Sequence, residues 1–177
     1  VGGGIHGVHI ATQLLASGNV ILSSLCIIDE HESLLQKWKT RTSNTGMKYL
    51  RSSAGYHLDV DENSLRRKFR AEKKIFFTRD YERPRLDIFN QHCDDVIEKY
   101  HLNEVHQSGK VVAIEPNDDY VEVKVSFNHC DEIKHYKAEN VVLALGNDEP
   151  SYPNWVHESD VEQGFVRHLL NEEKMDY

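Results

Sequence analysis

The first apolar pattern of the chain has the spacing of a helix. One face is formed by Val8, Ala11, Leu14 and Leu15. Gly18 follows, where a glycine commonly ends a helix. Residues 25–28 then form a short unbroken apolar run, as expected of a parallel strand covered on both faces, and the run ends at Asp29. The pattern predicts an amphipathic helix followed by a buried strand.

Further elements are predicted in the second half of the chain. An apolar stripe at helical spacing runs from Leu86 to about residue 101. Alternating, β-rich segments follow and predict three short antiparallel strands, a β-meander at residues 110–137. A last apolar run at residues 140–146 has the composition of a buried strand that ends at Gly146. Beyond it we expect only a short helix near residues 165–173. The order of these elements predicts an α/β fold.

A glycine-rich turn precedes the first helix, in the stretch Val-Gly-Gly-Gly-Ile-His-Gly at the start of the chain. In the pattern G-x-G-x-x-G, Gly2 permits a tight turn, Gly4 admits a close approach of ligand to backbone, and Gly7 lets helix and strand pack closely. The first amides of the helix, those of Ile5 and His6, would then meet a pyrophosphate. The turn therefore predicts a dinucleotide site.

An acidic residue stands at the position that this site requires. Asp29 lies 22 positions after Gly7 (29 − 7), at the end of the predicted strand, and Glu30 follows it. A carboxylate at this offset hydrogen-bonds the adenosine ribose and repels a 2′-phosphate. Asp29 therefore favours FAD or NAD over NADP at this site. The alternative is that Asp29 is an ordinary solvated acid at the end of a strand and binds no ribose.

The composition excludes several classes of function. The 177 residues suffice for about one domain. A formal charge of −8 argues against nucleic acid as the main partner. No apolar run is long enough to span a membrane, and no secretory signal is present. The three cysteines form no C-x-x-C pair, which favours a reducing compartment, the cytoplasm. The histidines lack zinc-ligand spacing, so we expect no metal site.

The order of the motifs resembles a known family. The segments G-G-G-I-H-G, I-I-D-E, W-K-T-R-T-S-N-T-G-M-K-Y-L-R-S and V-V-L-A-L-G-N-D-E-P succeed one another along the chain. Together they resemble the FAD-binding half of flavoprotein monooxygenases, and are most similar to FAD/NAD(P)-binding proteins related to lysine and ornithine N-hydroxylases. The resemblance covers roughly residues 1–155. It implies a Rossmann-like FAD-binding domain, a parallel sheet with helices, plus the small β-meander.

The resemblance also implies roles for single residues. Gly2, Gly4 and the amides of Ile5 and His6 would meet the pyrophosphate, and Asp29 or Glu30 would bind the ribose. The remaining contacts would come from Trp38, Met47, Leu50 and Arg51 near the flavin, Val111 or Val112 at the adenine, and Gly146 beside the FAD. For Trp38 and Met47, simple core packing is an equally good interpretation.

The expected activity is that of the FAD-binding part of an NAD(P)H-dependent flavin oxidoreductase, a monooxygenase that oxidises an amine or another soft nucleophile. Lys39 and Lys48 replace the histidine and glutamine usual in the N-hydroxylases, which puts amino-acid N-hydroxylation in doubt. A flavin reductase or dehydrogenase, or a non-catalytic redox module, remains an alternative. Neither a catalytic side chain nor an oligomeric state is predicted.

We also expect the chain to be part of a longer protein. Only Val1 precedes the glycine turn, where a full strand is usual, and no second G-x-G-x-x-G appears. NADPH or NADH would therefore bind through a domain absent from this chain, and residues 156–177 would form the connector toward it.

Overall fold

The computed structural model shows an α/β chain and describes residues 1–71, 73–127, 130–147 and 151–171. The helices are α1 (Ile5–Ala16), α2 (Gln36–Asn44), α3 (Ser64–Lys68), α4 (Lys73–Phe76), α5 (Leu86–Lys99) and α6 (Glu158–Glu162), with 3₁₀ turns at Leu22–Ser24 and Leu102–Val105. The strands are β1 (Ile27–Asp29), β2 (His106–Ser108), β3 (Lys110–Pro116), β4 (Val121–Phe127) and β5 (Cys130–Ala138). The predicted first helix, first strand and long second helix are therefore present as α1, β1 and α5.

A small parallel sheet lies at the start of α1. Strands β1 and β2 pair in parallel, with Ile28 opposite Gln107. The hydrogen bonds continue beyond β1, because the Gly2 amide donates to the carbonyl of Ile28 at 2.8 Å. On its other side Val1 bonds to the segment 142–144, donating to Val142 O at 2.7 Å and accepting from the Ala144 amide at 2.8 Å. Segments from both ends of the described chain thus meet beside the glycine turn.

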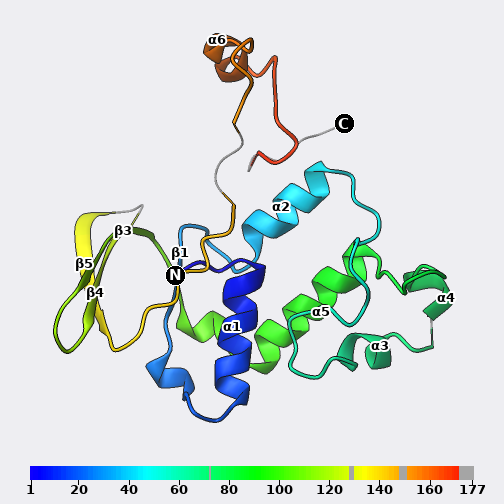
Figure 1. Ribbon diagram of the computed structural model, residues 1–177, viewed down its shortest axis with the longest axis horizontal. Helices are drawn as coiled ribbons and strands as arrows, with labels where there is room; N and C mark the ends of the chain where they lie inside the picture. The colour runs from blue at the N-terminus through cyan, green and yellow to red at the C-terminus, as the bar shows by residue number, and fades with distance from the viewer. Residues whose placement is uncertain (72, 128–129, 148–150, 172–177) are drawn as a thin grey trace.

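The three strands β3, β4 and β5 form a separate antiparallel sheet in that order, to one side of α1 (Figure 1). The sheet confirms the predicted meander. Its inner side packs on the parallel sheet, since Val123 and Val125 are buried against Ile28. A register shift between Val111 and Ala113 interrupts the pairing of β3 with β4.

The main core lies between α1, α5 and the irregular segments that connect them. Val8 and Ala11 of α1 face Phe89, Cys93 and Val96 of α5 within one buried cluster. Those α5 side chains follow the helical spacing that predicted the element. Ile27 of β1 and Ile88 and Ile97 of α5 belong to the same cluster. The other core side chains come from loops and short elements: Leu34, Leu35, Leu50, Ala54, Leu58, Leu65, Phe69, Phe77 and Leu102.

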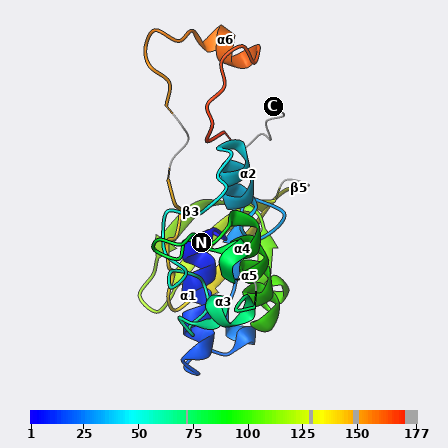
Figure 2. The ribbon, with the colours of Figure 1, turned by 90° about the vertical axis from the view of Figure 1, so that its right-hand side faces the viewer.

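The end of the described chain differs from the sequence-based expectations. Val142, Leu143 and Leu145 are exposed, so the prediction of a strand covered on both faces is wrong for this structure. The short helix expected near 165–173 is absent from its described part, and α6 lies earlier. Residues 151–171 form an arm that projects from the compact part beyond α2 (Figures 1 and 2). Residues 172–177 of the expected connector lie outside the described residues.

Within the described part of the chain, no helix has both the length and the apolarity that crossing a membrane requires.

Candidate functional site

The glycine turn is packed so tightly that two of its glycines have no room for a side chain. A Cβ on Gly7 would lie 1.8 Å from the carbonyl oxygen of Gly2, so α1 meets the turn at backbone contact distance. A Cβ on Gly2 would lie 2.3 Å from Ala144 O, and the φ of Gly2 is +101°, in the region that favours glycine. Gly2 and Gly7 therefore play the turn and packing parts that the motif predicts.

Gly4 differs from its neighbours because the space beside it is open. A Cβ on Gly4 would meet no described atom within 4 Å, and its φ of −76° is open to any residue. Gly4 is also the N-cap of α1, whose first helical bond runs from the Val8 amide to Gly4 O at 3.0 Å. The amides of Ile5 and His6 come before that bond and lack helical partners. A backbone surface with positive dipole is thus left clear at this point.

Asp29 braces the turn from the end of β1. Its carboxylate accepts the Gly3 amide at 2.6 Å and the His31 amide at 2.9 Å, and lies 2.7 Å from His31 Nδ1. Burial alone would raise the pKa of Asp29, but these bonds outweigh it and hold the pKa below its usual value. Glu30, the next residue, has an exposed side chain. Of the two predicted ribose ligands, Glu30 is the more accessible.

A cavity of about 460 Å³ opens next to the turn. Four of the residues predicted to contact the cofactor line it: Ile5, His6, Trp38 and Leu50. The ring of Phe89 lies 5.8 Å from that of Trp38 and adds a second aromatic wall. This first cavity has the volume of an ordinary small-molecule site and an apolar floor with polar groups at its edge.

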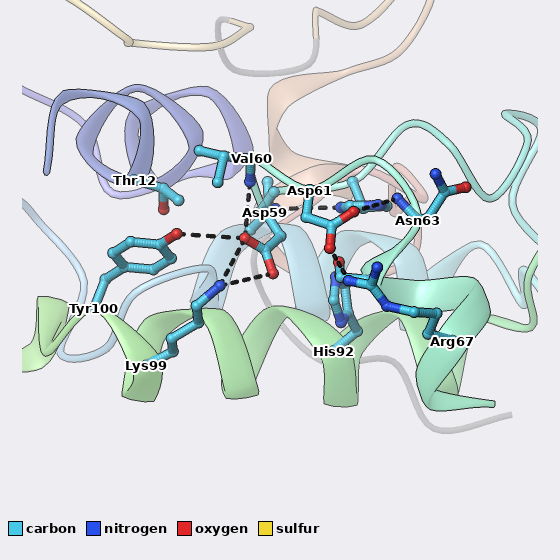
Figure 3. A network of polar contacts seen from close by, with 12 residues as sticks. Thr12, Asp59, Val60, Asp61, Asn63, Arg67, His92, Lys99 and Tyr100 are labelled. Carbon is cyan, nitrogen blue, oxygen red and sulfur yellow. Dashed lines mark hydrogen bonds and ion pairs between the residues drawn. The ribbon is translucent and has the colours of Figure 1, made fainter. Parts of the chain in front are cut away.

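The other wall of the first cavity is the loop 55–62, which polar contacts hold on α1 and α5. His9 Nδ1 of α1 lies 3.2 Å from the carbonyl oxygen of Leu58. The Asp59 carboxylate accepts from Lys99 Nζ at 3.1 Å and from the Val60 amide at 2.8 Å (Figure 3). Tyr100 also donates to Asp59, at 3.4 Å. The loop is thereby fixed over the cavity by contacts distant in sequence.

Two histidines, His57 of this loop and His92 of α5, are buried against each other. The rings of His57 and His92 meet edge to face with centroids 4.8 Å apart, and Ser64 Oγ lies 3.2 Å from His92 Nε2. Burial lowers the pKa of both rings, and the neighbouring His57 adds to the effect on His92, whose pKa falls to about 4. Both rings are therefore neutral near pH 7 and serve the packing of the loop.

The remaining predicted residues lie outside the first cavity. Met47 lines a second cavity, on the side of α2 that faces the start of α5, and Arg51 is exposed and lines neither. Val111 packs on the core of the antiparallel sheet, whereas Val112 points to solvent. Gly146 has a φ of +72° and open space at its Cβ position. Residues 148–150 of the segment V-V-L-A-L-G-N-D-E-P lie outside the described residues.

Several residues of the site could not be predicted from the sequence, because no motif or spacing connects them. His57 and His92 are 35 positions apart (92 − 57) in segments without a shared motif. Asp59 and Lys99 come together only because the loop crosses α5. Among the described residues no three histidine, cysteine, aspartate or glutamate side chains gather as metal ligands.

Neither the family models nor the curated proteins contain a match to this chain. The resemblance to flavoprotein monooxygenases therefore depends on the sequence motifs alone.

Proposed function

We propose that the chain binds FAD through its glycine turn, as the Rossmann-like FAD-binding portion of an NAD(P)H-dependent flavin oxidoreductase, a monooxygenase acting on an amine or another soft nucleophile. One observation carries the proposal. The turn excludes a side chain at Gly2 and Gly7, where the protein packs on itself, yet leaves room at Gly4, where nothing in the described chain approaches. A pyrophosphate needs this combination.

The acids at the end of β1 fit the same ligand with divided roles. Asp29 is occupied by the Gly3 and His31 amides, so it positions the turn. The exposed carboxylate of Glu30 is then the ribose ligand. This assignment explains why two acids stand in succession here.

The first cavity supports a flat ring system beside the pyrophosphate. Trp38, Phe89 and Leu50 supply apolar walls, while Ile5 and His6 connect the cavity to the start of α1. In this position the side chains would orient the flavin and exclude water from one part of it. Bound FAD supplies two-electron redox chemistry and, once reduced, reactivity toward dioxygen.

The decisive variant is Gly4→Val. Because the space beside Gly4 is open, the substitution should lower the free energy of unfolding by no more than about 1 kcal/mol, the cost of placing valine at an N-cap. The added side chain would stand where the pyrophosphate binds, and we expect the FAD dissociation constant to rise by roughly tenfold or more. Both quantities are measured on purified protein, by urea unfolding and by quenching of FAD fluorescence.

Gly7→Ala is the matched contrast. Its Cβ would meet the Gly2 carbonyl, so it should destabilise the fold by about 1–3 kcal/mol or more. Saturable FAD binding that Gly4→Val leaves unchanged would refute the pyrophosphate site, and wild-type protein that binds no FAD would refute the whole proposal.

The reaction class needs a separate assay with NADPH or NADH in air. Oxygenated product from an amine panel supports a monooxygenase. Hydrogen peroxide without such product would replace it by a flavin reductase or dehydrogenase.

A further inference from the structure

The second cavity, of about 680 Å³, lies between the end of α2 and the start of α5. Three cationic side chains line it, those of Lys39, Lys48 and Arg85, together with the carboxylate of Asp87. Met47 and Leu86 contribute apolar surface. Near neutral pH the charged groups that line the cavity sum to a positive charge, in a protein whose formal charge is −8.

Backbone pairing fixes the two segments of the cavity lining that carry Lys48 and Arg85. The Leu86 amide donates to Lys48 O at 3.0 Å, and the Leu50 amide donates to Pro84 O at 2.9 Å. Tyr49 and Arg85 form an antiparallel bridge between these bonds. The pairing sets Tyr49 opposite Arg85 and Lys48 opposite Leu86, so the backbone that carries both cationic residues is fixed where it lines the cavity.

The three cations differ in how far carboxylates already neutralise them. Lys39 Nζ lies 2.6 Å from Asp94, and Arg85 Nη2 lies 2.5 Å from Asp87. Both carboxylates are more than half exposed, so water screens these pairs. No carboxylate of the described residues pairs with Lys48, whose ammonium lies 5.9 Å from the Tyr49 ring centre. An anion could therefore bind Lys48 and also contact Arg85, because the ion pair of Arg85 with Asp87 is exposed to solvent.

The start of α5 adds a favourable field to that of the side chains. The helix has 14 residues, and no described side chain caps its first turn. Arg85, Leu86 and Asp87 at this end of the helix line the cavity, and the Leu86 amide already donates to Lys48 O. This end of the helix dipole carries partial positive charge and favours an anion.

We propose that the second cavity binds a small molecule carrying an oxyanion group, a phosphate or a carboxylate, on Lys48 and Arg85, with its apolar part against Met47 and Leu86. Lys39 strengthens the positive field at the side. The proposal goes beyond the dinucleotide site and does not require FAD to bind. Trp38 separates the two cavities, since its ring lines the first and its indole N–H donates to Asn90 of the second at 3.0 Å.

The test is titration of the whole chain with inorganic phosphate and, separately, with citrate, followed by amide shifts in ¹H–¹⁵N NMR at low salt. We expect saturable shifts at Gly46, Lys48 and Asp87. Lys48→Gln and Arg85→Gln should each weaken binding by about tenfold, the effect of losing one hydrogen bond to a charged group. Lys48→Arg, which keeps the charge, should retain most of the affinity. Stronger binding of phosphate or of citrate assigns the oxyanion.

Lys110→Gln is the matched control, because Lys110 is an exposed lysine of β3 that lines neither cavity. Equal weakening by this variant would show unspecific charge attraction and overturn the proposal. Shifts confined to Gly2, Gly3 and Gly4 would overturn it as well and would favour the glycine turn as the anion site. Gly4→Val leaves the second cavity intact, so failure of FAD binding and failure of oxyanion binding are distinguishable.

Discussion

His92 is the side chain whose ionisation is most strongly shifted by the fold. The residue is 4% exposed, and its pKa of about 4 results from burial first and from His57 second. Asp59 and Asp95 raise the pKa in part, whereas Lys68 lowers it. His92 therefore stays neutral in the folded protein at a pH where the unfolded chain is already protonated.

This difference predicts a loss of stability in mild acid. The folded pKa lies below the unfolded value of 6.5, so the stabilisation is complete above about pH 6.5 and declines as the pH falls toward 4. The total loss is on the order of 3 kcal/mol, by 1.36 kcal/mol per pKa unit. Urea unfolding at pH 7.5, 5.5 and 4 measures it.

His92→Gln is the comparison for that series. The variant should show a shallower decline between pH 6.5 and 4, with a remainder from His57, whose pKa burial also lowers. The pKa values of Asp29 and Asp59 are lowered from 3.8, so the stability that these carboxylates provide is lost only below the range in which His92 becomes protonated. An identical decline in the variant and the wild type would show that His92 is not its cause.

At the scale of elements, the loop 55–62 is the wall of the first cavity, and Asp59 attaches it to the end of α5. The Asp59 side chain is 6% exposed, whereas that of Lys99 is 53% exposed. The buried carboxylate satisfies the Val60 amide as well as the lysine. Most of the stabilisation should therefore come from the buried partner.

Two substitutions separate these contributions. Asp59→Ala should lower the free energy of unfolding by about 1–3 kcal/mol, because it removes the buried acceptor that the Val60 amide, Lys99 and Tyr100 share. Lys99→Met should cost less than about 1 kcal/mol, as expected of a solvent-screened pair. Urea unfolding gives both values. Equal costs would contradict the division and assign the effect to the ion pair.

The elements that the sequence predicted are those with a regular period. Helix α1, helix α5 and the meander follow from apolar spacing, since each buries one face against a neighbour, whereas strand β1 follows from an unbroken apolar run. Between residues 33 and 82 the core consists of loops and short helices, in which burial follows no period. The composition around Trp38 and Leu50 fits either a wall for a flat ring system or a packed loop, and only the family resemblance favours the first. The second cavity was not predicted.

At the scale of the whole molecule, the arm 151–171 stands apart from the core (Figure 2). Trp155 and Phe165, its largest apolar side chains, are 79% and 78% exposed. One described bond joins the arm to α2, from Asn44 Nδ2 to Asn171 O at 3.1 Å. The arm therefore buries little apolar surface on the compact part.

Removal of residues 151–177 should consequently change the free energy of unfolding by less than about 1 kcal/mol, and Tm by less than about 4 °C. Differential scanning calorimetry of the two forms measures this, and limited proteolysis should cleave first within 151–171. A larger fall in Tm would show that the arm contributes to the core.

The apolar residues 142, 143 and 145 are exposed, although the sequence predicted that they would be buried. Their composition is that of a strand buried on both faces, a property that depends on the elements covering it. The apolar composition shows that these residues would be more stable when buried, but whether they are buried depends on which other elements pack on them.

The position of Trp38 between the two cavities has an optical consequence. The protein contains two tryptophans, and the other, Trp155, lies on the arm. With Trp155 replaced by phenylalanine, all indole emission would come from a ring that touches the first cavity and hydrogen-bonds a wall of the second. Trp38 would then report both ligands by different signals. A flavin in the first cavity would quench its emission by energy transfer, whereas an oxyanion in the second cavity would shift its emission wavelength.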